Sequence, residues 1–320
     1  MIIARSGGQD KSFFHLALID FQVILVQGAR FQQGPSANNP SRKGLLICSG
    51  FLLSWFSEGS LELQSHTFRY SMCITNSNSA KSVRKAISSI TPLLSTGLFE
   101  IVVVDNQSSD GSGEFLRELY DKGVIHKFRS VKCSRGRGRN LASLMASGQY
   151  LLANIDTDVV YDSCKILEVL KEYHERFEGK VLSITGMMIL PREVALRLGG
   201  WKDLDRHEDN EISLNAYSQG LHAQKESVSV ISAHLKQHQG AMRKILEAYV
   251  SYRDWFRIGL KLSDLPRNQL YRTTVLMGYL SSKFHKKYPN PLFSEWWKLG
   301  WSGIEYGARS SHTHPAVPIE

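Results

Sequence analysis

The chain has 320 residues, of which 42% are hydrophobic, enough for a folded core and too many for a disordered protein. Its formal net charge is +9, yet residues 71–235 hold 20 basic and 20 acidic side chains, whereas residues 236–320 hold 13 and 6. Because the charges of residues 71–235 balance, we do not expect this central part to bind nucleic acid. It favours peripheral contact of the C-terminal part with an anionic membrane, although a solvated basic surface explains the charge equally well.

The four cysteines, Cys48, Cys73, Cys133 and Cys164, show neither CxxC nor Cys/His spacing. They indicate neither a zinc site nor a disulfide framework, which fits a reducing compartment. No apolar run reaches the roughly 18 residues that span a bilayer, and the N-terminal residues lack the uninterrupted apolar core of a secretory signal. We therefore expect a cytoplasmic protein, one that can lie at the periphery of a membrane.

The chain divides into three parts by its patterning. Residues 1–69 show no clear periodicity, and we interpret them as an N-terminal extension of unclear structure. In residues 70–240, short β-rich runs alternate with helical segments, which is typical of a parallel sheet with crossover helices. Residues 241–320 begin with a helical pattern over 241–262 and are rich in Trp, Tyr, Lys and Arg, so we expect a helical, basic and aromatic C-terminal region.

Within residues 70–240 the individual elements can be predicted from periodicity and from end signals. The expected strands are 70–75, 99–104, 127–132, 149–155 and 181–189, and residues 228–233 are also strand-like. The expected helices are 80–94, 112–122, 141–147 ending at Gly148, 166–177, and 210–218 closed by Gly220.

Two of the predicted buried strands run directly into aspartates, Asp105 and Asp156. Ligands of open parallel sheets bind beyond the carboxyl ends of the strands, so both carboxylates should face one site. Asp156 also begins an Asp-Thr-Asp triplet that ends at Asp158. A hard divalent cation takes oxygen ligands, so the triplet predicts a Mg²⁺ or Mn²⁺ site that holds a substrate diphosphate. The alternative is that these aspartates only form turns and helix caps.

Four motifs follow one another in order: VVVDNQSSDGS, SRGRGRNLASLMASGQYLLANIDTDVVY, GGW and HEDNEISLNAYSQG. Together they resemble the family 2 glycosyltransferases of the GT-A fold over roughly half of the chain. The resemblance implies an α/β fold of nucleotide-diphospho-sugar transferase type, a mostly parallel mixed sheet flanked by helices, here with a helical C-terminal extension. It also implies inverting, metal-dependent transfer from a UDP-, GDP- or dTDP-sugar to a hydroxyl of a glycan, lipid-linked or protein acceptor.

The resemblance also implies roles for individual residues. The nucleotide-sugar contacts would be Thr75, Ser77, Asp105, Asn106, Arg139 and Asp156; the metal ligands Asp156 and Asp158; and the catalytic acidic pair Glu208 and Asp209. The acceptor hydroxyl must lose its proton as it attacks, and Asp209 is our choice of general base. The alternative is that Glu208, Asp209 and Glu211 only occupy the first turn of an exposed helix, where acids interact favourably with the helix dipole.

The sequence departs from the family's pattern at two places. Thr75 to Asn78 stand where a proline and an aromatic residue usually precede an asparagine, and Asn215 stands where an arginine is common. A non-catalytic sugar-nucleotide-binding or scaffold protein of the same fold is therefore an alternative. A sugar nucleotidyltransferase or a methyltransferase would need a glycine-rich loop after the first strand, which TNSNSAKS does not supply.

Two further sets of residues have both a functional and a structural interpretation. His234 follows a strand-like segment and could complete the metal shell, although a lone histidine is more often structural. Trp296, Trp297 and Trp301 could lie at a membrane interface, but we expect them to pack in the core.

Overall fold

The computed structural model describes residues 68–235, 240–265, 269, 272–294 and 297. All of them belong to one compact unit, Ser57–Glu320. The prediction for residues 1–69 falls almost wholly outside the described residues, as do Trp296 and Trp301.

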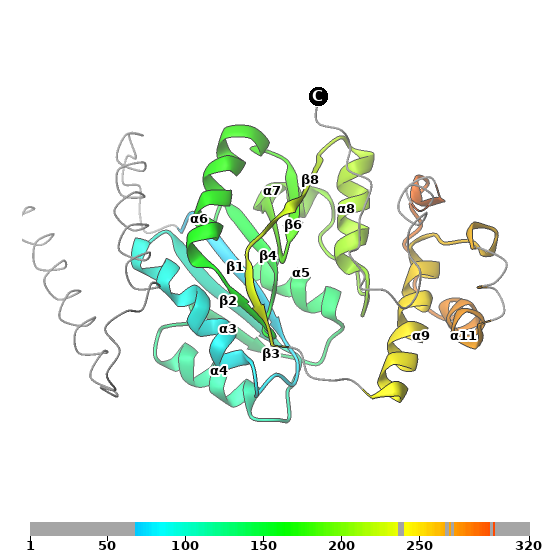
Figure 1. The fold of residues 1–320 in the computed structure, drawn as a ribbon, viewed down its shortest axis with the longest axis horizontal. Coiled ribbons are helices and arrows are strands. Elements are labelled where there is room, and N and C mark those ends of the chain that lie inside the picture. The colour runs from blue at the N-terminus through cyan, green and yellow to red at the C-terminus, as the bar shows by residue number, and fades with distance from the viewer. Residues whose placement is uncertain (1–67, 236–239, 266–268, 270–271, 295–296, 298–320) are drawn as a thin grey trace, which may run out of the picture. The chain divides into compact units, whose positions relative to one another are not determined.

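A seven-stranded sheet lies at the centre of the described chain, with the strand order β3-β2-β1-β4-β7-β6-β8 (Figure 1). Its strands are β1 (Tyr70–Asn76), β2 (Phe99–Asp105), β3 (Lys127–Ser130), β4 (Tyr150–Asp156), β6 (Val181–Thr185), β7 (Met187–Pro191) and β8 (His222–Ser229). All neighbouring strands pair in parallel except for β7, which is antiparallel to β4 and β6. Strands β5 (Val159–Tyr161) and β9 (Ile231–His234) form a separate antiparallel pair. The predicted mostly parallel mixed sheet is confirmed.

Helices cover both faces of this sheet, as the prediction required. One face packs against α3 (Val83–Ile90), α4 (Ser112–Asp121) and α6 (Ser163–Glu172), and the other against α5 (Arg135–Met145), α7 (Arg192–Arg197) and α8 (Glu208–Ser218). Short helical turns follow at Thr91–Thr96 and Tyr173–Phe177. Strand β2 shows why both faces are covered, because alternate side chains belong to different cores: Ile101 and Val103 to the first, Val102 and Val104 to the second.

The C-terminal region contains α9 (Ala241–Ile258), the short turn Leu262–Asp264 and α11 (Thr273–Ser282). A third core joins these elements to the preceding domain, since Leu204 and Leu214 pack with Tyr252 and Trp255 of α9. Trp297 is 2% exposed and belongs to this core. No helix in the described part of the chain is both long and apolar enough to cross a membrane.

The prediction of a helix over 141–147 that ends at Gly148 was wrong at both ends. Helix α5 begins six residues earlier, where the Ser134 side chain accepts a hydrogen bond from the Arg137 backbone N–H. The helix includes Gly136 and Gly138 because neighbouring segments approach it closely: a Cβ at Gly138 would lie 3.1 Å from Thr75 Cγ2. It ends at Met145, before Gly148.

The strand predicted over 181–189 is two strands. Gly186 separates β6 from β7 and has a φ of 94°, a left-handed conformation that favours glycine. The chain reverses there into an antiparallel hairpin, since Leu182 pairs with Ile189. A continuous strand-like pattern therefore concealed a turn whose main sequence signal was one glycine.

Candidate active site

Strands β2, β1 and β4 lie side by side and in parallel, so their carboxyl ends share one edge of the sheet. The register pairs Asn76 with Asp105 on one side of β1, and Thr75 with Asp156 on the other. Asp105 and Asp156 were predicted to face a common site. They are the last residues of β2 and β4, the two strands that flank β1 (Figure 1).

Asp105 ends β2 as a buried carboxylate that is only 1% exposed. Its Oδ1 accepts hydrogen bonds from Asn76 Nδ2 at 2.7 Å and from Ser108 Oγ at 2.6 Å. Its Oδ2 accepts from the Ser108 backbone N–H at 3.0 Å and from Ser130 Oγ at 3.2 Å. A buried carboxylate needs such donors, so the loop after β2 is folded around Asp105.

Asn76 links this loop to the Asp-Thr-Asp triplet. Its side chain, 2% exposed, donates to Ser112 Oγ at 3.0 Å in addition to Asp105, and it accepts a hydrogen bond from Thr157 Oγ1 at 3.1 Å. Thr157 is the central residue of the triplet. The stretch that departs from the family pattern at Thr75 to Asn78 thus supplies the side chain that joins two strand ends.

Arg139 connects the triplet to the acidic pair. Its guanidinium, 5% exposed, donates to Asn154 Oδ1 at 2.7 Å and to Asp156 Oδ1 at 3.3 Å, and it forms an ion pair with Glu208 Oε1 at 2.8 Å. Burial lowers the pKa of Arg139, but Glu208 and Asp156 outweigh it and raise that pKa above its ordinary value. The side chain is therefore a permanent buried cation between two carboxylates that are 52 residues apart in the sequence.

The first turn of α8 contains two acids in different environments. Glu208 is 1% exposed, and burial raises its pKa to about 7 against the opposing effect of Arg139. Asp209 is half-buried. Burial raises the pKa of Asp209, but Arg139 and His207 outweigh it, so the pKa lies below its ordinary value. Asp209 is thus ionised at neutral pH and able to accept a proton, whereas Glu208 is held against Arg139.

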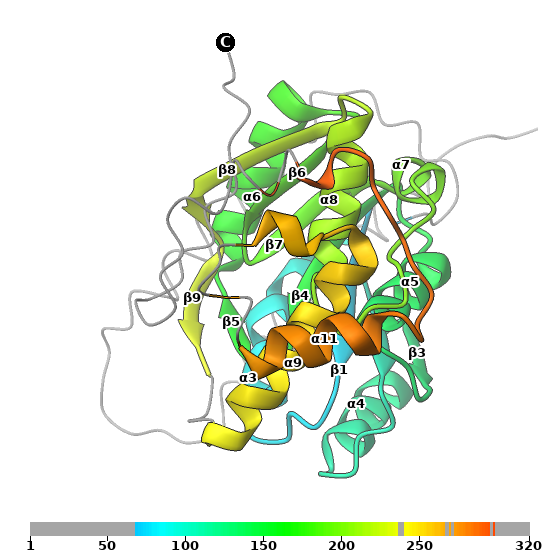
Figure 2. The same cartoon turned by 90° about the vertical axis from the view of Figure 1, so that its right-hand side faces the viewer.

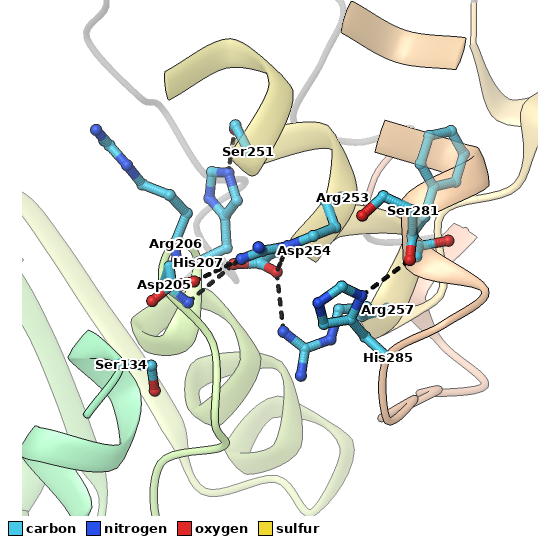
Figure 3. A network of polar contacts seen from close by, with 12 residues as sticks. Ser134, Asp205, Arg206, His207, Ser251, Arg253, Asp254, Arg257, Ser281 and His285 are labelled. Carbon is cyan, nitrogen blue, oxygen red and sulfur yellow. Dashed lines mark hydrogen bonds and ion pairs between the residues drawn. The ribbon is translucent and has the colours of Figure 1, made fainter. Parts of the chain in front are cut away.

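Helix α9 holds the loop that leads into this turn (Figure 3). Asp254 is fully buried, and its Oδ2 accepts hydrogen bonds from the backbone N–H groups of Asp205 and Arg206, both at 2.9 Å. Arg253 and Arg257 bind the other oxygen, Oδ1, at 2.9 and 3.0 Å. Every oxygen of this buried carboxylate is satisfied, so the loop is fixed to α9 two residues before the acidic pair.

His207 is fixed to the same helix. It has a φ of 63°, an uncommon left-handed conformation for a residue with a side chain. Its ring stacks on Trp255 with a centroid distance of 3.8 Å, and its Nε2 hydrogen-bonds Ser251 Oγ at 2.5 Å. Two contacts from α9 therefore hold the backbone geometry from which α8 starts.

The Asp-Thr-Asp triplet has its backbone held at both ends. The Asp156 N–H donates to the Tyr161 hydroxyl at 2.7 Å, and the Asp158 carbonyl accepts from the Leu235 N–H at 2.8 Å. The Asp156 side chain is 43% exposed, and no described residue donates a hydrogen bond to the half-buried Asp158 carboxylate. His234 lies opposite Val159 in the adjoining β-ladder.

The donor set of the triplet fits a hard divalent cation that is shared with a phosphate group. No group of three or more His, Cys, Asp or Glu side chains able to hold a metal occurs within the described ranges. Magnesium usually binds through one or two carboxylates plus substrate phosphates, and Asp156 and Asp158 supply two partly exposed carboxylates.

The remaining predicted residues lie near the same strand ends. Thr75 belongs to β1 and Ser77 follows it with an exposed side chain. Asn106 follows Asp105, and its Oδ1 accepts a hydrogen bond from the Cys133 N–H at 2.9 Å. Sequence reasoning assigned no role to Asn154, Thr157 or Asp254. Asn154 has a φ of 63° inside a strand, and a polar residue within an apolar run was its only sequence signal.

The comparison with protein families now gives the class of the protein. The model described as glycosyl transferase family 2 matches residues 71–235, just over half of the chain. The chain belongs to glycosyl transferase family 2. No curated protein matches the chain.

Several solved structures are distantly similar to the chain. S. aureus TarS is 15% identical with a TM-score of 0.44; the match covers 69% of this chain and 44% of TarS, so this chain spans less than half of that protein. The mannosyltransferase PcManGT from Pyrobaculum calidifontis, in complex with GDP-Man and Mn²⁺, is 16% identical with a TM-score of 0.46, over 75% and 83% of the two chains. Glucosyl-3-phosphoglycerate synthase from Mycobacterium tuberculosis, in complex with Mn²⁺, UDP and glucosyl-3-phosphoglycerate, is 16% identical with a TM-score of 0.44, over 68% and 84%.

Proposed function

We propose that this protein transfers a sugar from a nucleotide diphosphate to an acceptor hydroxyl with inversion at the anomeric carbon, and that Asp209 is the general base. The observation that carries the proposal is the buried bridge of Arg139 between Asp156 and Glu208. This bridge links the strand end suited to a donor diphosphate to the turn that holds an ionised carboxylate.

On the donor side, Asp158 and Asp156 would hold Mg²⁺ or Mn²⁺, which when bound neutralises the charge that develops on the leaving diphosphate. Ser77, Thr75 and Asn106 lie at the carboxyl ends of β1 and β2, where the nucleoside would bind. Asp105 keeps the loop after β2 in shape through its four hydrogen bonds. Arg139 acts as a positioning residue, because its guanidinium is already engaged by protein groups.

On the acceptor side, a hydroxyl is a poor nucleophile until its proton is removed during attack. The lowered pKa of Asp209 keeps this carboxylate ionised at neutral pH, so it can take that proton. Glu208 is buried against Arg139 and serves to orient the first turn of α8. Attack from the face opposite the leaving diphosphate would give the inverted product.

The experiment is a transfer assay in which the purified chain is incubated with UDP-, GDP- and dTDP-sugars, a panel of glycan and lipid-linked acceptors, and Mn²⁺ or EDTA. We expect product with one nucleotide class, loss of product in EDTA, recovery with Mn²⁺, and an inverted anomeric configuration by NMR. A retained configuration would overturn the inverting mechanism.

A non-catalytic nucleotide-sugar-binding protein is the second candidate, and the departures at Thr75 to Asn78 and at Asn215 are the features that favour it. The two candidates differ in one measurable outcome. If a nucleotide sugar stabilises the chain against heat and neither transfer nor donor hydrolysis occurs with any acceptor, the binding protein is the better description.

A further inference from the structure

Helices α9 and α11 carry an unusual share of the exposed apolar surface. Among the described residues, eleven large hydrophobic side chains are exposed, and seven of them belong to this helix pair. In α9 they are Met242 (78% exposed), Ile245 (55%) and Leu246 (58%); in and just after α11 they are Leu276 (52%), Met277 (58%), Leu280 (48%) and Phe284 (88%). We call these seven side chains the α9–α11 surface.

The surface follows from how the two helices pack. Gly278 lies so close to α9 that a Cβ there would be 2.8 Å from the backbone nitrogen of Arg253. The Tyr249 hydroxyl also donates a hydrogen bond to Ser281 Oγ at 2.8 Å. These contacts bury one side of α11 on the second half of α9. Figure 2 shows α11 in front of α9, with the first turns of α9 extending beyond the crossing. The apolar side chains therefore project from the sides that neither helix covers.

The charge around this surface is strongly positive. The 30 residues from 265 to 294 contain no Asp or Glu, whereas Lys283, Lys286 and Lys287 follow α11 directly. On the first turns of α9, Lys244 is exposed and the nearest acid, Glu247, is paired with Arg206 and Arg243. Exposed apolar side chains that are flanked by cations, with the one neighbouring acid of α9 already paired with two arginines, match the interface of a membrane that contains anionic lipid.

Side-chain geometry agrees with that partner. Lys283 places its ammonium over the Tyr279 ring, 4.7 Å from the ring centre, so a cation and an aromatic ring lie together at the end of α11. At a membrane interface a lysine can bury its stem among apolar groups while its charge remains at headgroup level. A symmetric dimer through the same surface would instead bring Lys244, Lys283 and Lys286 toward copies of themselves, because an isologous interface repeats one patch.

We propose that the α9–α11 surface docks this protein on anionic phospholipid. The docking does not depend on glycosyl transfer and is measured without donor or acceptor. It would bring the catalytic domain to the lipid surface, because the second half of α9 holds the loop before α8 through Asp254.

The test is co-sedimentation of the full chain with vesicles of phosphatidylcholine alone and with 30% phosphatidylglycerol, at low and high salt. Two double variants separate the apolar contribution to binding from the electrostatic one. Met277→Ser with Phe284→Ser removes apolar side chains, and Lys244→Glu with Lys286→Glu reverses two positive charges. The matched controls are Leu144→Ser with Leu196→Ser, two exposed leucines elsewhere in the chain, and Lys85→Glu, an exposed lysine of α3. Circular dichroism and Tm establish that each variant is folded.

We expect binding to the anionic vesicles only, weakened at least about tenfold by either double variant and by high salt, and unchanged in the controls. Equal sedimentation of wild type and both folded double variants would overturn the proposal, as would no binding to anionic vesicles. A dimer that dissociates in the Met277→Ser, Phe284→Ser variant, without any vesicle binding by the wild type, would assign the surface to self-association instead.

Discussion

Two regions of the molecule meet at the candidate site, and they hold their side chains in different ways. At the carboxyl ends of β1, β2 and β4, Asp105 and Asp156 are placed by the strands that they terminate. The acidic pair of α8 is placed by a separate segment, because Asp254 of α9 binds the loop that precedes it. The proposed donor side is thus built into the sheet, while the proposed acceptor side depends on the C-terminal region.

The largest effect should come from the donor side. Asp158→Ala removes a carboxylate that no described residue engages, so the fold should keep its Tm within a few degrees. If this side chain holds the metal on a diphosphate, transfer should fall at least about 100-fold, with partial recovery at high Mn²⁺. The matched control is Asp121→Ala, an exposed acid at the end of α4. Full activity of Asp158→Ala at low Mn²⁺ would exclude the proposed metal role.

A smaller effect is expected from the acceptor side when its support is weakened. Asp254→Asn keeps the shape of the side chain but removes the charge that Arg253 and Arg257 bind. The loop before α8 should loosen, so we expect kcat to fall about 10- to 100-fold while the KM for the donor stays within about twofold.

The readout that separates positioning from general destabilisation is hydrogen exchange at the Asp205 and Arg206 amides, which should become faster in Asp254→Asn. Asp264→Asn is the matched control. Asp264 accepts from the Lys261 N–H and from Ser294, so this variant should lower the Tm without lowering kcat. An unchanged kcat in folded Asp254→Asn would show that α9 does not position the acidic pair.

The smallest effect concerns stability and pH. Burial raises the pKa of Glu211 to about 7, with Lys202 opposing. When the pKa of an acid is higher in the folded protein than in the unfolded chain, the unfolded chain releases the proton first. The protein therefore loses stability as pH rises from about 4.5 to 7. Glu211→Gln removes this loss of stability. The Tm of the variant should therefore equal that of wild type at pH 4.5 and be higher than that of wild type at pH 8.

That comparison is checked by thermal unfolding across pH, with the exposed Glu114→Gln as control. Glu208 has a pKa that burial also raises to about 7, so a slope should remain in Glu211→Gln. The shift of the Glu211 pKa from 4.5 to about 7 corresponds to a loss of roughly 3 kcal/mol in folding stability. Parallel Tm curves for wild type and Glu211→Gln would mean that Glu211 is charged in the folded protein at neutral pH.

The contrast between the two regions also explains what the sequence could predict. Asp105 and Asp156 follow apolar runs directly, so a local pattern was enough to locate both strand ends. Nothing local indicates that Asn76 contacts Thr157, 81 residues away, or that Asp254 binds Arg206, 48 residues away. Contacts at such separations depend on how whole elements pack, which periodicity does not encode.

The same limit applies to the errors in the predicted elements. The predicted helix over 141–147 left out the two glycines of SRGRGRN, which lie within α5 and allow close packing against Thr75 and the segment around Lys202. The family resemblance supplied the acidic pair as a unit. The structure distinguishes its two members: Glu208 is buried against Arg139, whereas the pKa of Asp209 is lowered, so that Asp209 is ionised.

The most direct test of the account compares wild type with Asp209→Asn in two measurements on the same protein: the Kd for the nucleotide-sugar donor with Mn²⁺, and the single-turnover rate of transfer. The amide keeps the size of the side chain but cannot take a proton. We predict a donor Kd within about twofold of wild type and a transfer rate lower by about 10²–10⁴-fold. Transfer at the wild-type rate by Asp209→Asn would contradict the assignment of this residue as the general base.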